Sequence, residues 1–72
     1  MQYFIVMIDY PGAREAVVNP EITRREIISR IASGEYDRER ISFIHRVRDC
    51  TVEDVTAELT DEAQTLRLEA AE

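Results

Sequence analysis

His45 and Cys50 are the side chains of this sequence best suited to acid–base or nucleophilic chemistry, and each residue type occurs once. An imidazole is the side chain whose unperturbed pKa lies closest to neutrality. A Cys–His nucleophile also needs an orienting third group and an oxyanion hole, and these two residues lie too far apart to touch along one extended strand. We therefore expect a packed histidine, an ordinary loop cysteine and no enzyme. The alternative is a minimal enzyme whose site forms around His45 between two subunits.

Metal and cofactor sites find equally little support in the sequence. One cysteine excludes an internal disulfide, and one cysteine with one histidine is too few for a structural zinc site. The carboxylates lack the alternating spacing and turn glycine of a calcium loop. Gly12 and Gly34 occur singly, so no glycine-rich loop is present to cradle a phosphate. We expect no catalytic residue, no metal and no cofactor.

Charge is distributed unevenly along the chain. Up to Arg48 there are seven acidic residues and eight arginines, a net charge of +1, whereas from Asp49 onward there are eight acidic residues and one arginine, a net charge of −7. Nucleic-acid binding depends on cationic contacts with phosphates, so the acidic half disfavours it. The same half suits a protein partner with a basic surface, because complementary fields speed encounter and fix orientation.

The acidic half supplies the candidate partner-binding residues, with a merely solvated acidic face as the alternative. These carboxylates are Glu53, Asp54, Glu58, Asp61 and Glu62. In size and charge the chain resembles the small phage-encoded inhibitors of bacterial defence complexes, including anti-CRISPR proteins that occupy DNA-binding grooves. That resemblance implies a non-enzymatic inhibitor or adaptor. Without an apolar run of about 18 residues or a signal sequence, we expect the cytoplasm, or the host cytoplasm if a virus encodes the chain.

The first half of the chain predicts one or two strands and a helix. Residues 2–9 alternate with apolar side chains on both faces, which is typical of a central strand. Residues 16–18 indicate a short edge strand. Asn19 followed by proline and glutamate predicts a helix start, and Gly34 predicts its end. Arg24 falls on the apolar stripe of this helix, where we expect it either to extend its head into water or to meet a carboxylate.

The second half predicts a strand, a tight hairpin and a helix. Residues 41–48 form the strand, with one face made by Ile41, Phe43, His45 and Val47. Asp49 and Cys50 then form the hairpin loop, a strand runs over residues 51–56, and Thr60 begins a final helix. The alternative is one continuous helix from Thr51, because an apolar series recurs there at spacings of three and four. Its members are Val52, Val55, Leu59, Ala63, Leu66 and Ala70.

Together these elements predict a single α+β domain spanning residues 1–72. Its order is β-(β)-α-β-β-α, with an antiparallel sheet of three or four strands and two helices in a second layer. A chain of this size has a small core, and two helices can cover only one face of such a sheet. Because the first strand is apolar on both faces, we expect an uncovered apolar face and a homodimer, or docking on a larger protein. A small homodimeric regulatory or structural subunit is therefore the alternative to an inhibitor or adaptor.

Overall fold

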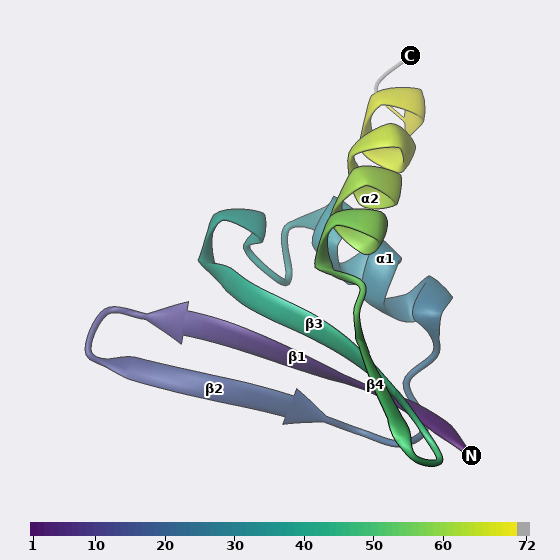
Figure 1. Cartoon of the computed structure of the whole chain (residues 1–72). Coiled ribbons are helices and arrows are strands. Elements are labelled where there is room, and N and C mark those ends of the chain that lie inside the picture. The colour runs from purple at the N-terminus through teal and green to yellow at the C-terminus, as the bar shows by residue number, and fades with distance from the viewer. Residues whose placement is uncertain (71–72) are drawn as a thin grey trace.

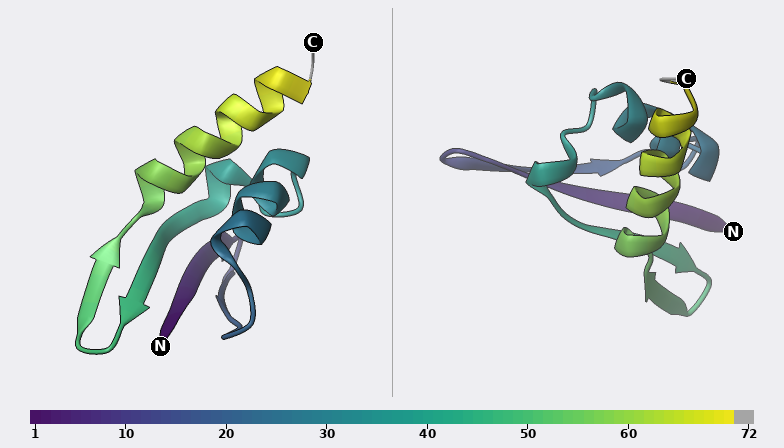
Figure 2. Two further views of the ribbon diagram at one scale, coloured as in Figure 1. Left: turned by 90° about the vertical axis from the view of Figure 1, so that its right-hand side faces the viewer. Right: turned by 90° about the horizontal axis from the view of Figure 1, so that it is seen from above.

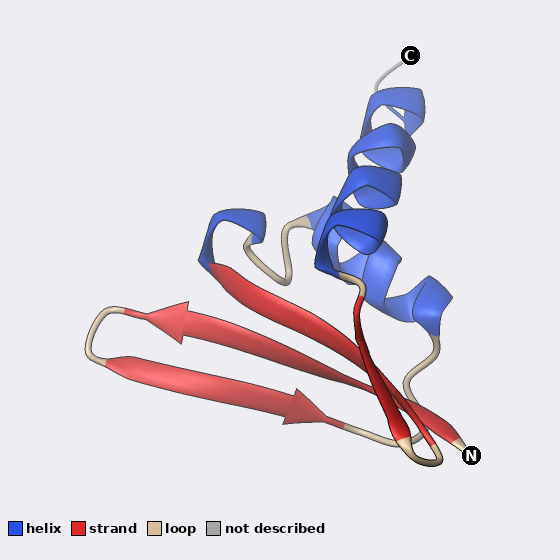
Figure 3. Cartoon of the chain, viewed as in Figure 1, coloured by secondary structure: helices blue, strands red, loops and turns tan. Residues whose placement is uncertain are grey.

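The elements of the chain follow the predicted order in a computed structural model that describes residues 1–70 (Figures 1 and 3). The structure is a small α+β domain with one antiparallel sheet of strand order β2-β1-β3-β4. The elements are β1 (Gln2–Tyr10), β2 (Ala13–Val18), α1 (Arg24–Ser33), a short 3-10 turn η1 (Arg38–Arg40), β3 (Ile41–Arg48), β4 (Thr51–Asp54) and α2 (Thr56–Ala70). The optional second strand of the prediction is therefore present.

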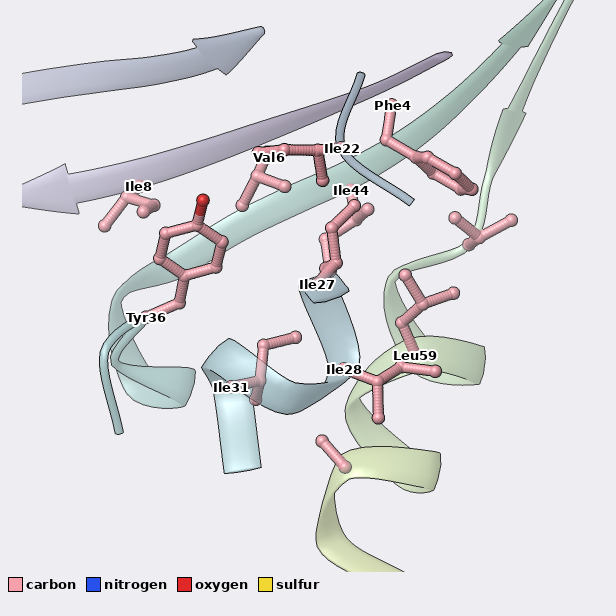
Figure 4. Packing of buried hydrophobic residues seen from close by; sticks show 12 residues of the cluster. Phe4, Val6, Ile8, Ile22, Ile27, Ile28, Ile31, Tyr36, Ile44 and Leu59 are labelled. Atoms are coloured by element: carbon pink, nitrogen blue, oxygen red, sulfur yellow. The ribbon is translucent and has the colours of Figure 1, made fainter. Parts of the chain in front are cut away.

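Both helices lie over the same face of the sheet (Figure 2). The side chains of β1 alternate, and the buried ones, Phe4, Val6 and Ile8, point toward the helices. Ile27 of α1 and Leu59 of α2 are fully buried against them, as the close view of the core shows (Figure 4). The opposite face of the sheet carries no helix within residues 1–70. The expectation that two helices cover only one face is confirmed.

A bulge in β3 changes which of its side chains share a face. Opposite β1, Phe43 pairs with Met7 and Ile41 pairs with Ile8, so the register skips Ser42. Ile41 consequently turns to the helix side, where it packs against the core. The prediction that Ile41 shares a face with Phe43, His45 and Val47 is wrong at this one position, because the extra residue reverses the alternation.

The helix α1 begins later than the sequence signals predicted. Asn19 organises a separate turn instead, in which its side chain accepts from the Glu21 N–H at 2.9 Å and its carbonyl from the Ile22 N–H at 3.0 Å. Ile22 is thereby buried, and Thr23 becomes the N-cap, with its side chain accepting from the Glu26 N–H. The predicted end is confirmed, since Gly34 lies in the left-handed region with φ of 87°.

The C-terminal segment combines the two sequence-based alternatives. β4 is a strand, so one continuous helix from Thr51 is wrong, and Asp49 and Cys50 form the predicted hairpin loop. The helix nevertheless starts at Thr56, ahead of the predicted Thr60. Thr60 lies inside the helix, where its hydroxyl donates to the Thr56 carbonyl at 2.8 Å. The side chain of Ala70, the last position of the apolar series, lies outside the described residues.

Candidate interaction surfaces

The uncovered face of the sheet carries apolar side chains from all four strands, and we call it the open face. On the two central strands it is formed by Tyr3, Ile5, Met7, Phe43, His45 and Val47, all half-buried. On the outer strands it continues through Ala16 and Val18 of β2 and Val52 of β4. The half-burial comes from neighbouring side chains within the sheet, because the helices lie on the other side.

The register arranges these side chains in rows across the strands. Tyr3 lies opposite Val47, which lies opposite Val52 in turn, and Met7 lies opposite Phe43. The rings of Phe43 and His45 stack with centroids 4.1 Å apart and an interplanar angle of 26°. The cross-strand pairs stabilise the sheet, and the stacked rings on β3 place aromatic groups at the middle of a broad apolar surface.

The edges of the open face are exposed, and few charged groups lie on it. Val18 is 51% exposed and Val52 is 62% exposed. At one end Arg14 donates through Nε to Asp9 at 2.6 Å, which pairs two opposite charges on this face. On the opposite edge strand, Asp54 lies across from His45. The rim of the open face therefore carries one ion pair and one further carboxylate, Asp54, whose bonds go to Thr56.

Thr56 connects the sheet to the start of α2. Its hydroxyl accepts from the Ile44 N–H at 2.8 Å and donates to Oδ1 of Asp54 at 2.6 Å, while its own N–H donates to the same oxygen at 2.9 Å. These bonds to Thr56, from the hydroxyl first, lower the pKa of Asp54, and the charge of His45 adds to the effect. Asp54, one of the predicted partner-binding carboxylates, thus has an internal structural role.

Two further candidate carboxylates converge on one arginine. Arg24 donates through Nη1 and Nη2 to the two oxygens of Glu62 at 2.7 and 2.6 Å, and through Nη2 and Nε to Glu58 at 3.0 and 3.3 Å. The bidentate bond from Arg24 lowers the pKa of Glu62, and the pKa of Arg24 is raised by Glu62 and then Glu58. The carboxylate partner expected as one alternative for Arg24 is present.

The other two candidates lie apart from this cluster. Glu53 is on the helix side of β4, where Arg46 donates to it at 3.0 Å and Arg48 approaches within 3.8 Å, and the bond from Arg46 lowers its pKa. Asp61 is exposed on α2 and takes part in no ion pair among residues 1–70. The structure therefore brings Glu58 and Glu62 together and places Glu53 and Asp54 on opposite faces of β4. Three of the five carboxylates form ion pairs with arginines, and Glu58 and Glu62 share one arginine.

His45 and Cys50 do not meet in a hollow. His45 lies on the open face, and Cys50 is exposed in the hairpin loop. Two hollows of the described chain lie beside the helices, and neither His45 nor Cys50 lines them. Among residues 1–70, no three side chains of His, Cys, Asp or Glu gather closely enough to hold a metal ion, and no helix is long and apolar enough to cross a membrane.

The sequence did not reveal the role of Thr56 or the ion pairs that the acidic side chains form with arginines of the same chain. Thr56 follows Asp54 by two residues, and an aspartate side chain often accepts a hydrogen bond from the backbone N–H two residues later. This local signal could have located the helix start. Nothing local could have paired Arg24 with Glu58 and Glu62, because they are brought together by the packing of α1 against α2.

The fold and these surfaces define a small α+β domain with one covered and one open sheet face. No protein-family model, curated protein or solved structure matches the chain.

Proposed function

We propose that this chain is a non-enzymatic protein-binding module that associates with a second copy of itself through the open face. One observation supports this above all others: both helices cover the same side of the sheet, and the other side presents apolar side chains from all four strands. An apolar surface of this extent rimmed by polar residues is typical of a protein–protein interface. Burying it removes that apolar surface from water.

The size of the domain strengthens the case for association. A chain of about this length buries only about 60% of the surface that its unfolded form exposes. Among residues 1–70, the core contains twelve buried apolar residues, all on the helix side. Such a core alone supplies only about 3–5 kcal/mol of net stability. A second apolar layer formed between two open faces would add to that stability.

The charge distribution favours a second copy as the partner. α2 carries four carboxylates and one arginine, a net charge of −3 that is half of the chain's −6, and it lies on the layer away from the open face. On the open face, Asp9 already pairs with Arg14, so two copies can meet face to face with their acidic helices pointing outward. Such a two-fold arrangement makes each contact twice, which suits a face whose centre is formed by apolar and aromatic side chains.

A nucleic acid is a poorer match for the same face, although aromatic side chains can stack on bases. Stacking platforms work together with cations that follow the phosphate backbone. Among the described residues of the open face, Arg14 is the one arginine, and it is bound to Asp9. A single-stranded oligonucleotide added to the protein is therefore expected to leave its sedimentation unchanged.

The proposal is tested by placing a charge at the exposed edge of the open face. Val52→Glu alters a side chain that is already 62% exposed, so the folded monomer should tolerate it. Leu68→Glu is the matched control, because Leu68 is 59% exposed on α2. Sedimentation equilibrium at low and high micromolar concentrations should give the mass of two chains for the wild type and for Leu68→Glu, and of one chain for Val52→Glu.

The salt dependence of the association provides a second measurement. A dimer held by apolar contacts should persist in high salt, whereas contacts between exposed charges are screened within about 10 Å at 0.1 M. A wild-type chain that sediments as a monomer throughout this range, or a Val52→Glu variant that stays as dimeric as Leu68→Glu, would refute association through this face.

A further inference from the structure

The helical layer carries a second surface, a groove between α1 and α2 with a volume of about 730 Å³. Its floor is apolar, formed by Ile28 of α1 and Leu66 of α2, and its walls carry opposite charges. Arg24 and Arg25 lie on the α1 wall, and Glu62 and Glu69 lie on the α2 wall. A concave surface of this size with an apolar floor and a few polar groups is typical of a binding site.

The groove exists because α2 extends beyond α1, the helix against which it packs. Leu59 and Ala63 are buried against the core, but Leu66, next on the same side of the helix, is 43% exposed. The cartoon shows the last turns of α2 projecting beyond α1 toward the C-terminus (Figures 1 and 2). The apolar stripe of α2 thus runs on without a partner at Leu66, and Ile28 beside it is nearly buried, with 8% of its surface exposed.

The charges around the groove indicate which kind of segment it would accept. Along α2 the acidic residues Glu58, Asp61, Glu62 and Glu69 outnumber Arg67. Arg24 satisfies Glu58 and Glu62, whereas Glu69 takes part in no ion pair among residues 1–70, and the same holds for Arg25 on the facing wall. A basic group over Glu69 and an acidic group over Arg25 would each find an opposite charge there.

From this arrangement we infer that the groove is a docking site for a basic amphipathic helix of another protein. The apolar side of that helix would cover Ile28 and Leu66 with residues three or four apart, and its lysines or arginines would face Glu69. A second copy of α2 is a poorer occupant, because it would set one acidic helix against another. This inference goes beyond self-association and does not depend on it, since the groove and the open face lie on opposite layers.

A labelled peptide tests the docking directly. The probe is a helical peptide about four turns long, with leucines along one stripe and lysines on one flank, compared with a version that has glutamate in place of lysine. Leu66→Asn removes the apolar floor and should weaken binding of the lysine peptide about tenfold or more, which corresponds to about 1.4 kcal/mol. Leu68→Asn is the matched control and should bind within about twofold of the wild type, because Leu68 does not line the groove.

Charge reversal supplies the second arm of the experiment. Glu69→Arg should weaken the lysine peptide and strengthen the glutamate peptide, whereas Asp61→Arg, the same change away from the groove, should alter both far less. Equal effects of Leu66→Asn and Leu68→Asn, equal effects of the two reversals, or no binding of the lysine peptide would each overturn the inference.

The two proposed surfaces are separated by a crossed measurement. Val52→Glu should bind the lysine peptide as the wild type does, and Leu66→Asn should keep the wild-type sedimentation. Loss of the dimer in Leu66→Asn would assign the groove to self-association and overturn docking of another protein. Loss of peptide binding in Val52→Glu would place the peptide on the open face and overturn the groove.

Discussion

Replacing Thr56 by valine should destabilise the domain more than its position at a helix start suggests. Its hydroxyl is the acceptor for the Ile44 N–H at 2.8 Å and also the donor to Asp54 at 2.6 Å. Ile44 is fully buried at 0% exposure, so its N–H cannot turn to water when the hydroxyl is removed. Valine keeps nearly the same shape, which confines the change to these hydrogen bonds.

The expected size of the effect follows from the buried N–H. Leaving a buried donor without a partner costs about 1–3 kcal/mol. A domain of this size has roughly 3–5 kcal/mol of net stability from its core, so the loss is a large fraction of the total. At about 4–8 °C per kcal/mol for so small a domain, the midpoint of thermal unfolding should fall by about 4–24 °C.

Urea and thermal unfolding followed by circular dichroism measure this loss. All variants are compared at pH 7 and at one protein concentration, because association shifts apparent stability. Thr56→Ser restores the hydroxyl and should recover most of the stability. Thr65→Val is the matched control, since the Thr65 hydroxyl bonds only the exposed helix turn before it, at 3.2 Å to the Asp61 carbonyl; it should change stability by less than about 0.5 kcal/mol. Equal losses for the two valine variants, or no recovery with serine, would show that the Ile44 N–H does not depend on Thr56.

Three further predictions concern acid sensitivity, one ion-pair cluster and one turn. The folded state lowers the pKa of Glu53, Asp54 and Glu62, so the stability that they contribute is complete well above the ordinary carboxyl pKa of about 4 and is lost as pH falls through the lower folded values. Urea unfolding from pH 7 to 2 should show this fall in the free energy of unfolding. A free energy of unfolding that rises on acidification would contradict it. Arg24→Gln should raise the pKa of Glu62 toward its ordinary value, as followed by NMR titration, and an unchanged pKa would show that Arg24 is not its cause. Gly34→Ala should cost about 1–2 kcal/mol because φ is 87° there, Gly34→Asn should cost less, and equal losses would argue against strain as the reason.

The alternation of apolar and polar residues predicted most of the sheet, because successive side chains of a strand point to opposite faces. The two apolar faces of β1, together with the limited reach of two helices, were enough to predict an uncovered face. The alternation in β3 was misleading at Ile41 alone, where the bulge at Ser42 shifts the register against β1. Such a bulge depends on the partner strand, so the β3 sequence by itself carries no clear signal of it.

Helix boundaries were predicted where the terminal signal is local and unopposed. Gly34 ends α1 as predicted, because the left-handed backbone at that position needs no tertiary partner. At the start, two capping signals compete: Asn19 closes a turn and Thr23 caps the helix, and the burial of Ile22 between them is a tertiary effect. Thr56 likewise starts α2 ahead of Thr60 because its hydroxyl is held by Ile44 on another strand.

The sequence by itself determined the inventory: the element order, an apolar strand with two faces, the acidic second half and the sparse set of reactive side chains. The tertiary structure decided the assignment of those groups, placing Phe43 and His45 on the open face and pairing Glu58 and Glu62 with Arg24. The physical reason is the distance along the chain over which each interaction acts. Periodicity and capping act within a few residues, whereas charge pairing and the burial of a face depend on segments that only folding brings together.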